Sequence, residues 1–358
     1  MRVSIPKSSL DRIIATFDLK VENFEMIKTG IRELSVFLQK DLKTFVFYTK
    51  ELGKVGSMPH IVGTELNKIM VHSSAKVFRG LNKILEGSIK RSLYNNSLLL
   101  LNVLRAGPGY GVKHATKKLF GRNPKDLWIR PTSYTEPQKH KAVRRVKIVF
   151  EDFSSIPKNR SLTIIKPDTE ATGQTSEAVI KRLIQAVEER NSQVERLITY
   201  GFASHVGISK LRKLSKKFGF ELVPTAVCCM PSLAYNDFDM PLYGLDLSFY
   251  EAEKKRKLVK GCYVPHEVLE EMLPLYPPGI DMPGDWSERQ LVLLTKPGEK
   301  SFGGVFTHLK VSFRRMKKLL ELSKKETWFE HWHERIFKQR LRELRRTMLF
   351  YLPFRGIH

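Results

Sequence analysis

The sequence predicts an α/β fold with a mostly parallel sheet and with helical extensions at both ends of the chain. Short β-rich runs alternate with helical patterns through the middle of the sequence, and apolar residues recur at helical spacing near both ends. Strands that alternate with helices in this way are typical of a parallel sheet covered by helices on both faces. With 358 residues, 42% of them hydrophobic, the chain can form one large domain with extensions or two domains.

The N-terminal part is predicted to be a helical extension. Between residues 24 and 48, apolar side chains recur three and four positions apart, which is the spacing of one helix face. A segment marked by glycine and proline at 53–63 then suggests a boundary. We therefore expect three parts: a helical extension at 1–60, an α/β domain at 61–255, and a Pro/Gly-rich connection with a basic helical region at 256–358.

The central part supplies the predicted sheet. A helix is expected at about 65–90, before the pattern changes to short runs rich in β-branched and aromatic residues. The predicted strands are 97–104, 146–150, 161–166, 196–202 and 220–227, and the helices between them are 111–120, 176–190 and 209–219.

The C-terminal part is predicted to be irregular at 274–285, to contain a strand near 290–294, and to be helical from about Lys310. Residues 310–358 hold 14 Lys and Arg against 5 Glu, a net charge of +9. Aromatic residues interleave with this charge. Two interpretations stay open for Trp328, Trp332 and Phe337: they stack on nucleic-acid bases, or they pack on the core.

The charge of the whole chain restricts the partners. The formal net charge of +25 attracts polyanions such as nucleic acid, nucleotide phosphates or acidic membrane surfaces. A soluble protein with a basic surface and no specific partner can have the same net charge. No run approaches the roughly 18 apolar residues that span a bilayer, and the first residues lack the apolar core of a signal peptide. Three cysteines without metal-ligand spacing argue against a disulfide framework and a zinc site. We therefore expect a soluble cytoplasmic protein.

One stretch, residues 161–176, has the pattern of a phosphate-binding loop. An apolar run leads to small and hydroxylated residues and then to an amphipathic helix. Backbone amides at such a turn, the positive end of the helix and nearby hydroxyl groups favour a phosphate group. Asp168 follows the strand, where a carboxylate can accept hydrogen bonds from a ribose diol. An ordinary turn with a capped helix is the alternative. The loop residues are Ala171, Thr172, Gly173, Gln174 and Thr175.

The stretch I-I-K-P-D-T-E-A-T-G-Q-T resembles the phosphate loop of type I phosphoribosyltransferases, and L-L-N-V-L-R-A-G at 100–107 resembles the strand and turn of the uracil phosphoribosyltransferases. A Trp-Ile-Arg strand ending at Arg130 and the segment 239–246 follow the same family order. The resemblance covers about residues 70–250. It implies a phosphoribosyltransferase fold for the domain at 61–255.

The resemblance also implies a chemistry. Phosphoribosyl pyrophosphate would bind with Mg²⁺, and its phosphoribose would pass to a nucleobase such as uracil. Asp168 and Arg130 would be the catalytic residues, and the loop at 171–175 would hold the 5′-phosphate and ribose. The residues implied for pyrophosphate are Arg105, Ala106 and Gly107, and those implied for the base are Tyr243, Gly244 and Asp246. No protein residue is expected to hold a metal.

The sequence departs from the family at three places. Pro167 stands where many members have a second acidic residue, Glu170 brings a negative charge into the loop, and the late loop keeps a single glycine, Gly244. An alternative therefore stays open, in which a non-catalytic protein on the same fold binds nucleic acid or regulates it. In that case RNA or DNA would bind through the basic C-terminal region. A purely structural protein and a homodimer are further hypotheses.

Overall fold

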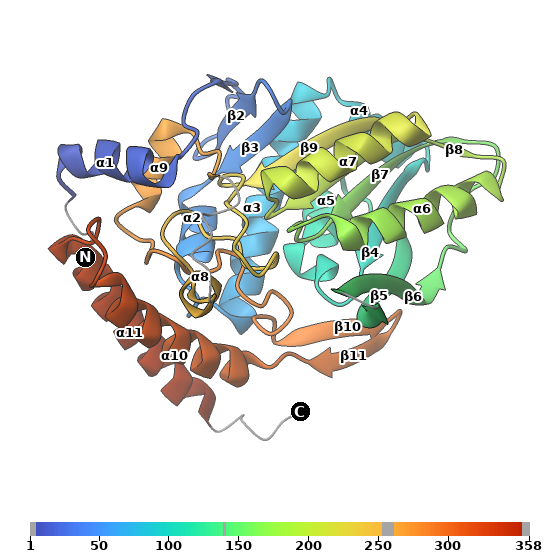
Figure 1. Cartoon of the computed structure of the whole chain (residues 1–358). Helices are drawn as coiled ribbons and strands as arrows, with labels where there is room; N and C mark the ends of the chain where they lie inside the picture. Colours follow the sequence, from blue (N-terminus) through green and yellow to red (C-terminus); the bar gives the residue numbers. More distant parts are fainter. Residues whose placement is uncertain (1–4, 139–140, 253–260, 353–358) are drawn as a thin grey trace.

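A nine-stranded sheet forms the centre of the computed structural model, which describes residues 5–138, 141–252 and 261–352 (Figure 1). The strand order within these residues is β1-β2-β3-β9-β8-β7-β4-β5-β6. The six strands from β3 to β5 in this order pair in parallel, and antiparallel pairs extend the sheet at both sides. The α/β class with a mostly parallel sheet, as predicted from the sequence, is therefore confirmed.

The parallel strands come from the region where alternation was predicted. They are β3 (Thr44–Tyr48), β4 (Leu98–Val103), β5 (Lys125–Gln138), β7 (Ser161–Pro167), β8 (Gln193–Gly201) and β9 (Glu221–Val227). The antiparallel strands are β1 (Phe24–Met26), β2 (Ser35–Gln39) and β6 (Lys141–Asp152). The helices that follow or precede them are α3 (Gly63–Ile84), α4 (Ser88–Tyr94), α5 (Val112–Phe120), α6 (Gln174–Glu188) and α7 (His205–Phe218), with a 3₁₀ turn η1 (Gly107–Tyr110) after β4.

The sheet separates two apolar cores, and β4 contributes to both. Leu98 and Leu100 belong to one core, whereas Leu99 and Leu101 belong to the other, because successive side chains of a strand point to opposite faces. Helices α6 and α7 cover the second face, and α3 covers the first (Figure 1). Burial on both faces explains why the sequence of β4 is a continuous apolar run rather than an alternating one.

The prediction of helix for residues 24–48 was wrong. Only α1 (Lys7–Phe17) and α2 (Lys50–Ser57) are helical in the described part of residues 1–60, and β1, β2 and β3 lie between them. β2 and β3 form a hairpin, and β3 pairs in parallel with β9. This pairing joins residues about 180 positions apart. The spacing of apolar residues in this segment fits either a helix or a strand, and the tertiary contacts decide between the two. The division into domains at residue 60 stays a prediction.

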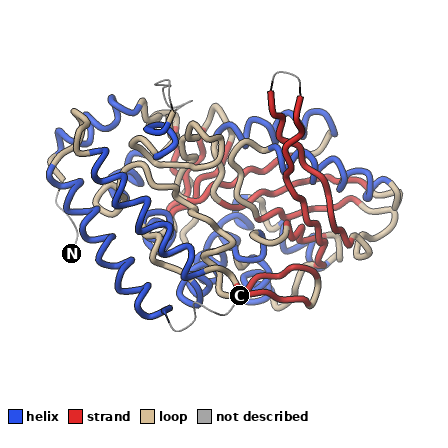
Figure 2. Tube along the Cα trace, turned by 60° about the horizontal axis from the view of Figure 1, so that its bottom comes forward, coloured by secondary structure: helices blue, strands red, loops and turns tan. Residues whose placement is uncertain are grey.

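The C-terminal region packs against the N-terminal helices. It contains α8 (Leu247–Glu251), α9 (His266–Met272), the hairpin of β10 (Val292–Lys296) and β11 (Glu299–Phe302), and the long helices α10 (Val305–Ser323) and α11 (His331–Tyr351). Figure 2 shows one end of the molecule formed mainly by helices, whereas strands and the helices that cover them form the other end. Trp328, Trp332 and Phe337 are all buried in the core, so packing is confirmed and stacking on bases is wrong for these three rings.

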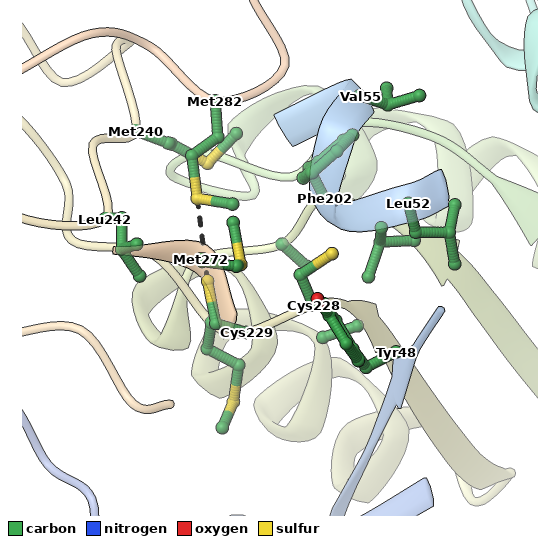
Figure 3. Close-up of a cluster of buried hydrophobic side chains, with 14 of the residues drawn as sticks. Tyr48, Leu52, Val55, Phe202, Cys228, Cys229, Met240, Leu242, Met272 and Met282 are labelled. Atoms are coloured by element: carbon green, nitrogen blue, oxygen red, sulfur yellow. Dashed lines mark hydrogen bonds between the residues drawn. The ribbon is translucent and has the colours of Figure 1, made fainter. Parts of the chain in front are cut away.

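A sulfur-rich cluster joins the end of β9 to the C-terminal segments (Figure 3). Cys228 and Cys229, which follow β9, pack with Met272 and Met282, and the Cys229 thiol lies 3.5 Å from the thioether of Met282. The three cysteines of the chain are free and buried. Polarisable side chains of this kind fill irregular space between elements that meet at different angles. No helix among the described residues is long and apolar enough to cross a membrane.

Candidate functional site

The predicted strand, loop and helix at 161–176 are present. β7 ends at Pro167, the loop crosses the carboxyl edge of the sheet, and α6 begins at Gln174. Gly173 caps the helix with φ +73°, a left-handed conformation that glycine adopts without strain. The side chains of Thr172 and Thr175 are partly exposed, and the amides of the first helical turn, which have no partner within the helix, lie at the same end of α6; the Gln174 amide donates to the Thr172 hydroxyl group at 3.5 Å.

The turn after β4 lies beside this loop. β4 pairs in parallel with β7, so their carboxyl ends reach the same edge of the sheet. The contact is close: a Cβ atom added to Gly107 would lie 2.8 Å from the carbonyl oxygen of Pro167. The Tyr110 hydroxyl group also lies 2.7 Å from the Thr169 hydroxyl group. The turn after β4 and the segment that leads into the loop at 171–175 therefore lie side by side at this edge of the sheet.

Arg105 and Arg130 lie at this edge too. Arg105 is exposed at the start of the turn, after a cis peptide bond to Leu104. Arg130 lies in β5 and is partly buried. It directly follows Ile129, which pairs with Val103, the last residue of β4. β5 continues to Gln138, so Arg130 does not end a strand as the sequence suggested, although a bulge follows it directly.

Asp168 is held by a buried lysine. The ammonium group of Lys166 donates to Oδ2 of Asp168 at 2.9 Å and also to the carboxylate of Glu170, and the Lys166 side chain is fully buried. The backbone amide of Thr169 donates to the other oxygen of Asp168 at 2.8 Å. Glu170 accepts a further hydrogen bond from the Ser176 hydroxyl group in the first turn of α6. This ion cluster ties the end of β7 to the start of α6.

Charge balance determines the protonation of the cluster. Burial by itself lowers the pKa of Lys166, but the two carboxylates outweigh it, so the net shift is upward. Burial raises the pKa of Glu170, and the charge of Asp168 adds to this while Lys166 opposes it. One ammonium group neutralises only one carboxylate, and Glu170 is the more buried of the two. The cluster therefore has a lysine that stays charged and a glutamate that takes up a proton more readily than usual.

Asp168 and Glu170 were singled out from the sequence, but Lys166 was not predicted as their partner. A signal was present, because residues i, i+2 and i+4 of an extended chain lie on one face. Lys210 in α7 was also missed as a site residue. It packs over Gly173, since a Cβ atom there would lie 3.0 Å from the side chain of Lys210, and its ammonium group pairs with Glu177 at 2.5 Å. No local pattern links α7 to the loop.

The C-terminal region contributes to the site as well. The Trp286 ring stacks on Tyr110 with 4.6 Å between ring centroids. The Gln290 amide donates to the carbonyl oxygens of Trp286, at 2.9 Å, and of Ala106, at 3.4 Å. A Cβ atom on Gly109 would overlap the amide end of the Gln290 side chain, so this side chain packs directly on the turn. The segment therefore supports the turn.

The residues implied for the base do not contact the loop through any of their described interactions. The Tyr243 ring is buried against Phe17, Tyr276 and His333. Gly244 packs on Pro278 and Gly279 with φ +88°, so its conformational freedom serves a close backbone approach. Asp246 is buried and caps α8 by accepting from the Ser248 amide at 2.8 Å.

Comparison with known proteins gives structural neighbours only. No family model matches the sequence, and no curated protein matches it. Solved structures that are similar include a hypoxanthine phosphoribosyltransferase from Staphylococcus aureus (17% identity, TM-score 0.25), covering 34% of this chain and 60% of that one. An adenine phosphoribosyltransferase from Thermoanaerobacter pseudethanolicus (17% identity, TM-score 0.24) covers 44% of this chain and 84% of that one.

A third neighbour is a hypothetical protein from Neisseria gonorrhoeae with bound ppGpp (10% identity, TM-score 0.30), covering 46% of this chain and 80% of that one. The present chain spans less than two thirds of the hypoxanthine enzyme. Because all three TM-scores lie below 0.5, the fold class rests on the topology of the sheet and not on these neighbours.

Proposed function

We propose that this protein binds phosphoribosyl pyrophosphate at the carboxyl edge of its sheet and transfers the phosphoribose to a nucleobase. The observation that carries the proposal is the contact of the turn after β4 with the segment that leads into the loop at 171–175. Gly107 lies against the carbonyl oxygen of Pro167, and the Tyr110 hydroxyl group lies 2.7 Å from the Thr169 hydroxyl group. A ligand with a phosphate at one end and a pyrophosphate at the other requires two such anion-binding segments at a fixed distance.

The residues have separate roles in this proposal. The 5′-phosphate binds to the amides and hydroxyl groups of 172–175, where the positive end of α6 favours an anion. Arg105 and the turn after it bind the pyrophosphate, and Arg130 supplies positive charge where the leaving group becomes more negative. Asp168 accepts hydrogen bonds from the ribose hydroxyl groups. Its oxygens already accept from Lys166 and Thr169, so the carboxylate is held in one orientation before the ligand arrives.

The reaction needs no protein nucleophile. Pyrophosphate leaves the anomeric carbon through an oxocarbenium-like transition state, a nitrogen atom of the base forms the new bond, and the proton of that nitrogen passes to the departing pyrophosphate or to water. Positioning and electrostatic stabilisation suffice for such a displacement. Mg²⁺ would supply charge neutralisation on the pyrophosphate. In proteins it is often held by substrate phosphates and few carboxylates.

We do not infer uracil as the specific acceptor. The segment 239–246 that suggested uracil has its glycine and tyrosine in the interior, against Pro278 and Phe17. The acceptor in this proposal is therefore a nucleobase of undefined type, and a panel of purines and pyrimidines is the appropriate assay.

A second function is favoured by the surface of the C-terminal helices. Arg314, Arg342, Arg345 and Arg346 are exposed on α10 and α11. By contrast, Arg340, one of the 14 basic residues of 310–358, is buried and donates to the carbonyl oxygen of Leu275 at 3.1 Å, so it does not belong to the exposed basic surface. Exposed arginines on one pair of helices support binding of RNA or DNA phosphates.

Calorimetry with phosphoribosyl pyrophosphate and Mg²⁺ tests the first function. The native protein is expected to bind, and the variant Thr172→Val/Thr175→Val, which removes two hydroxyl groups without changing the side-chain shape, is expected to bind about tenfold more weakly. Thr295→Val, in β10, is the matched control and should leave binding unchanged. Pyrophosphate release with the base panel then tests transfer. If the native protein does not bind the ligand, the proposed function is wrong.

A further inference from the structure

A polar pocket lies at the edge of the sheet opposite to the candidate site. It encloses about 440 Å³ between α4 and the amino ends of β7 and β8. Ser97, directly before β4, and Ser161, the first residue of β7, line it. Parallel strands begin at one edge and end at the other, so this pocket and the loop at 171–175 are separated by the length of the strands.

The lining has the composition of an anion site. All ten lining residues are polar or charged, with three arginines and one glutamate among them, a net charge of +2. We call it the arginine–serine pocket and define it by Ser88, Arg91, Ser92, Arg160, Thr163 and Arg196. The arginines come from three separate segments: α4, the residue before β7, and β8.

Hydrogen bonds orient part of this lining. Arg196 donates from Nη1 to the Ser88 hydroxyl group at 2.8 Å and from Nε to Glu221 at 2.7 Å, which fixes the plane of its guanidinium group. The hydroxyl groups of Ser92 and Thr163 lie 3.1 Å apart. Among the described residues no carboxylate pairs with Arg160 or Arg91, although Nη1 of Arg91 donates to the carbonyl oxygen of Glu86, so neither guanidinium charge is neutralised.

A bulge in β8 shapes the pocket. Leu162 pairs with Val194, but the next residue, Thr163, pairs with Arg196, so Glu195 is an extra residue in the strand. Such a bulge turns side chains that would otherwise face opposite sides. As a result both Glu195 and Arg196 line the pocket. Glu195 is the one carboxylate among the lining residues, and it limits how much negative charge the pocket accepts.

We propose that the arginine–serine pocket binds the phosphate group of a small phosphorylated molecule. Guanidinium groups match phosphate oxygens with paired N–H donors, and serine and threonine hydroxyl groups add single donors. The volume is within the range of roughly 300–1,000 Å³ for small-molecule sites, and walls without apolar residues suit a polar ligand such as a sugar phosphate. This site is independent of the function proposed above, because it shares no residue with the carboxyl edge.

Amide NMR of the full chain with inorganic phosphate as the probe tests this proposal. Phosphate is expected to shift the amide signals of 88–97 and 160–163 in the native protein. The variant Arg91→Gln/Arg160→Gln should lose these shifts, with affinity at this pocket reduced by about tenfold or more. The variant Arg32→Gln/Arg79→Gln removes the same charge from two exposed arginines and should keep them.

Two results would overturn the proposal. One is a response confined to 168–176, which would assign phosphate to the candidate site alone. The other is an equal loss of affinity in both double variants, which would show that general charge and not the pocket attracts phosphate. Because amides of the two edges are observed separately, failure here is distinguishable from failure of phosphoribosyl pyrophosphate binding.

Discussion

The ammonium group of Lys166 lies 2.9 Å from the carboxylate of Asp168, and both residues are buried at the end of β7. Lysine is rarely fully buried unless it is paired, because transfer of its charge from water is costly. Here the pairing joins the strand, through Glu170 and Ser176, to the first turn of α6. The loop at 171–175 is therefore held at both ends by one ion cluster.

Replacement of the buried lysine should destabilise the fold strongly. Lys166→Met leaves two carboxylates without their counter-charge, and we expect the free energy of unfolding to fall by about 3–5 kcal/mol. Urea denaturation measures this, with Lys216→Met, an exposed lysine of α7, as the control. Lys166→Met/Glu170→Gln should recover part of the loss because it removes the second charge. A cost for Lys166→Met that is no larger than that of the control would show that the cluster is not important for stability.

Asp168 and Glu170 should differ in their effect on the ligand. Both accept from Lys166, so Asp168→Asn and Glu170→Gln should each lower stability, by roughly 1–3 kcal/mol. Only Asp168→Asn should also weaken the binding of phosphoribosyl pyrophosphate, because Asp168 is the less buried carboxylate and lies at the strand end. Calorimetry on the two folded variants separates the effects. Equal affinity in both would remove Asp168 from the ribose site.

Acid should destabilise the protein partly through His308. Burial lowers the pKa of this histidine from 6.5 to about 3, and its Nε2 contacts the carbonyl oxygen of Pro59 at 2.9 Å. Between these two values the unfolded chain binds a proton that the folded chain does not. The free energy of unfolding therefore decreases as the pH falls from 6.5 towards 3, by about 1.4 kcal/mol per pH unit for this group.

The variant His308→Gln should show a shallower decrease between pH 6.5 and 4.5, measured by urea denaturation at several pH values. His331→Gln is the matched control, because the side chain of His331 is 81% exposed. Identical pH dependence in the native protein and His308→Gln would contradict the assignment.

Nucleic-acid binding should depend on the arginines of α11. The variant Arg342→Gln/Arg345→Gln/Arg346→Gln should bind RNA or DNA more weakly, and the slope of log affinity against log salt should fall by about 2–3. Truncation before Lys310 is not a suitable test, because it would remove Met316, Ile336 and Leu344 from the core.

A matched set on α7, Lys213→Gln/Lys216→Gln/Lys217→Gln, removes the same charge from another exposed surface. Filter binding across a salt series compares the two variants. If the α7 variant loses more affinity, the basic surface that matters lies on the core. If the native protein shows no salt-dependent binding at low ionic strength, the excess charge is a solvated surface.

The sequence by itself determined the elements whose signals are local. The apolar run at 161–167, the small residues after it and the amphipathic helix that follows are neighbours in the chain, so strand, loop and helix could be predicted together. The continuous apolar run of β4 likewise indicated burial on both faces. The phosphate loop and the Arg105 turn could be placed at one edge because parallel strands share their carboxyl ends.

Tertiary structure decided what depends on distant partners. Residues 24–48 have a spacing that fits a helix, but pairing of β3 with β9 makes them strands. The side chain of Lys210 reaches Gly173 only because α6 and α7 pack together, and Trp286 reaches Tyr110 only because the C-terminal region folds back on the turn. Tyr243 resembled a base-binding residue by its order in the sequence, yet helices from both ends of the chain enclose it. The physical reason is common to these cases: burial and pairing energies are set by residues that no local pattern identifies.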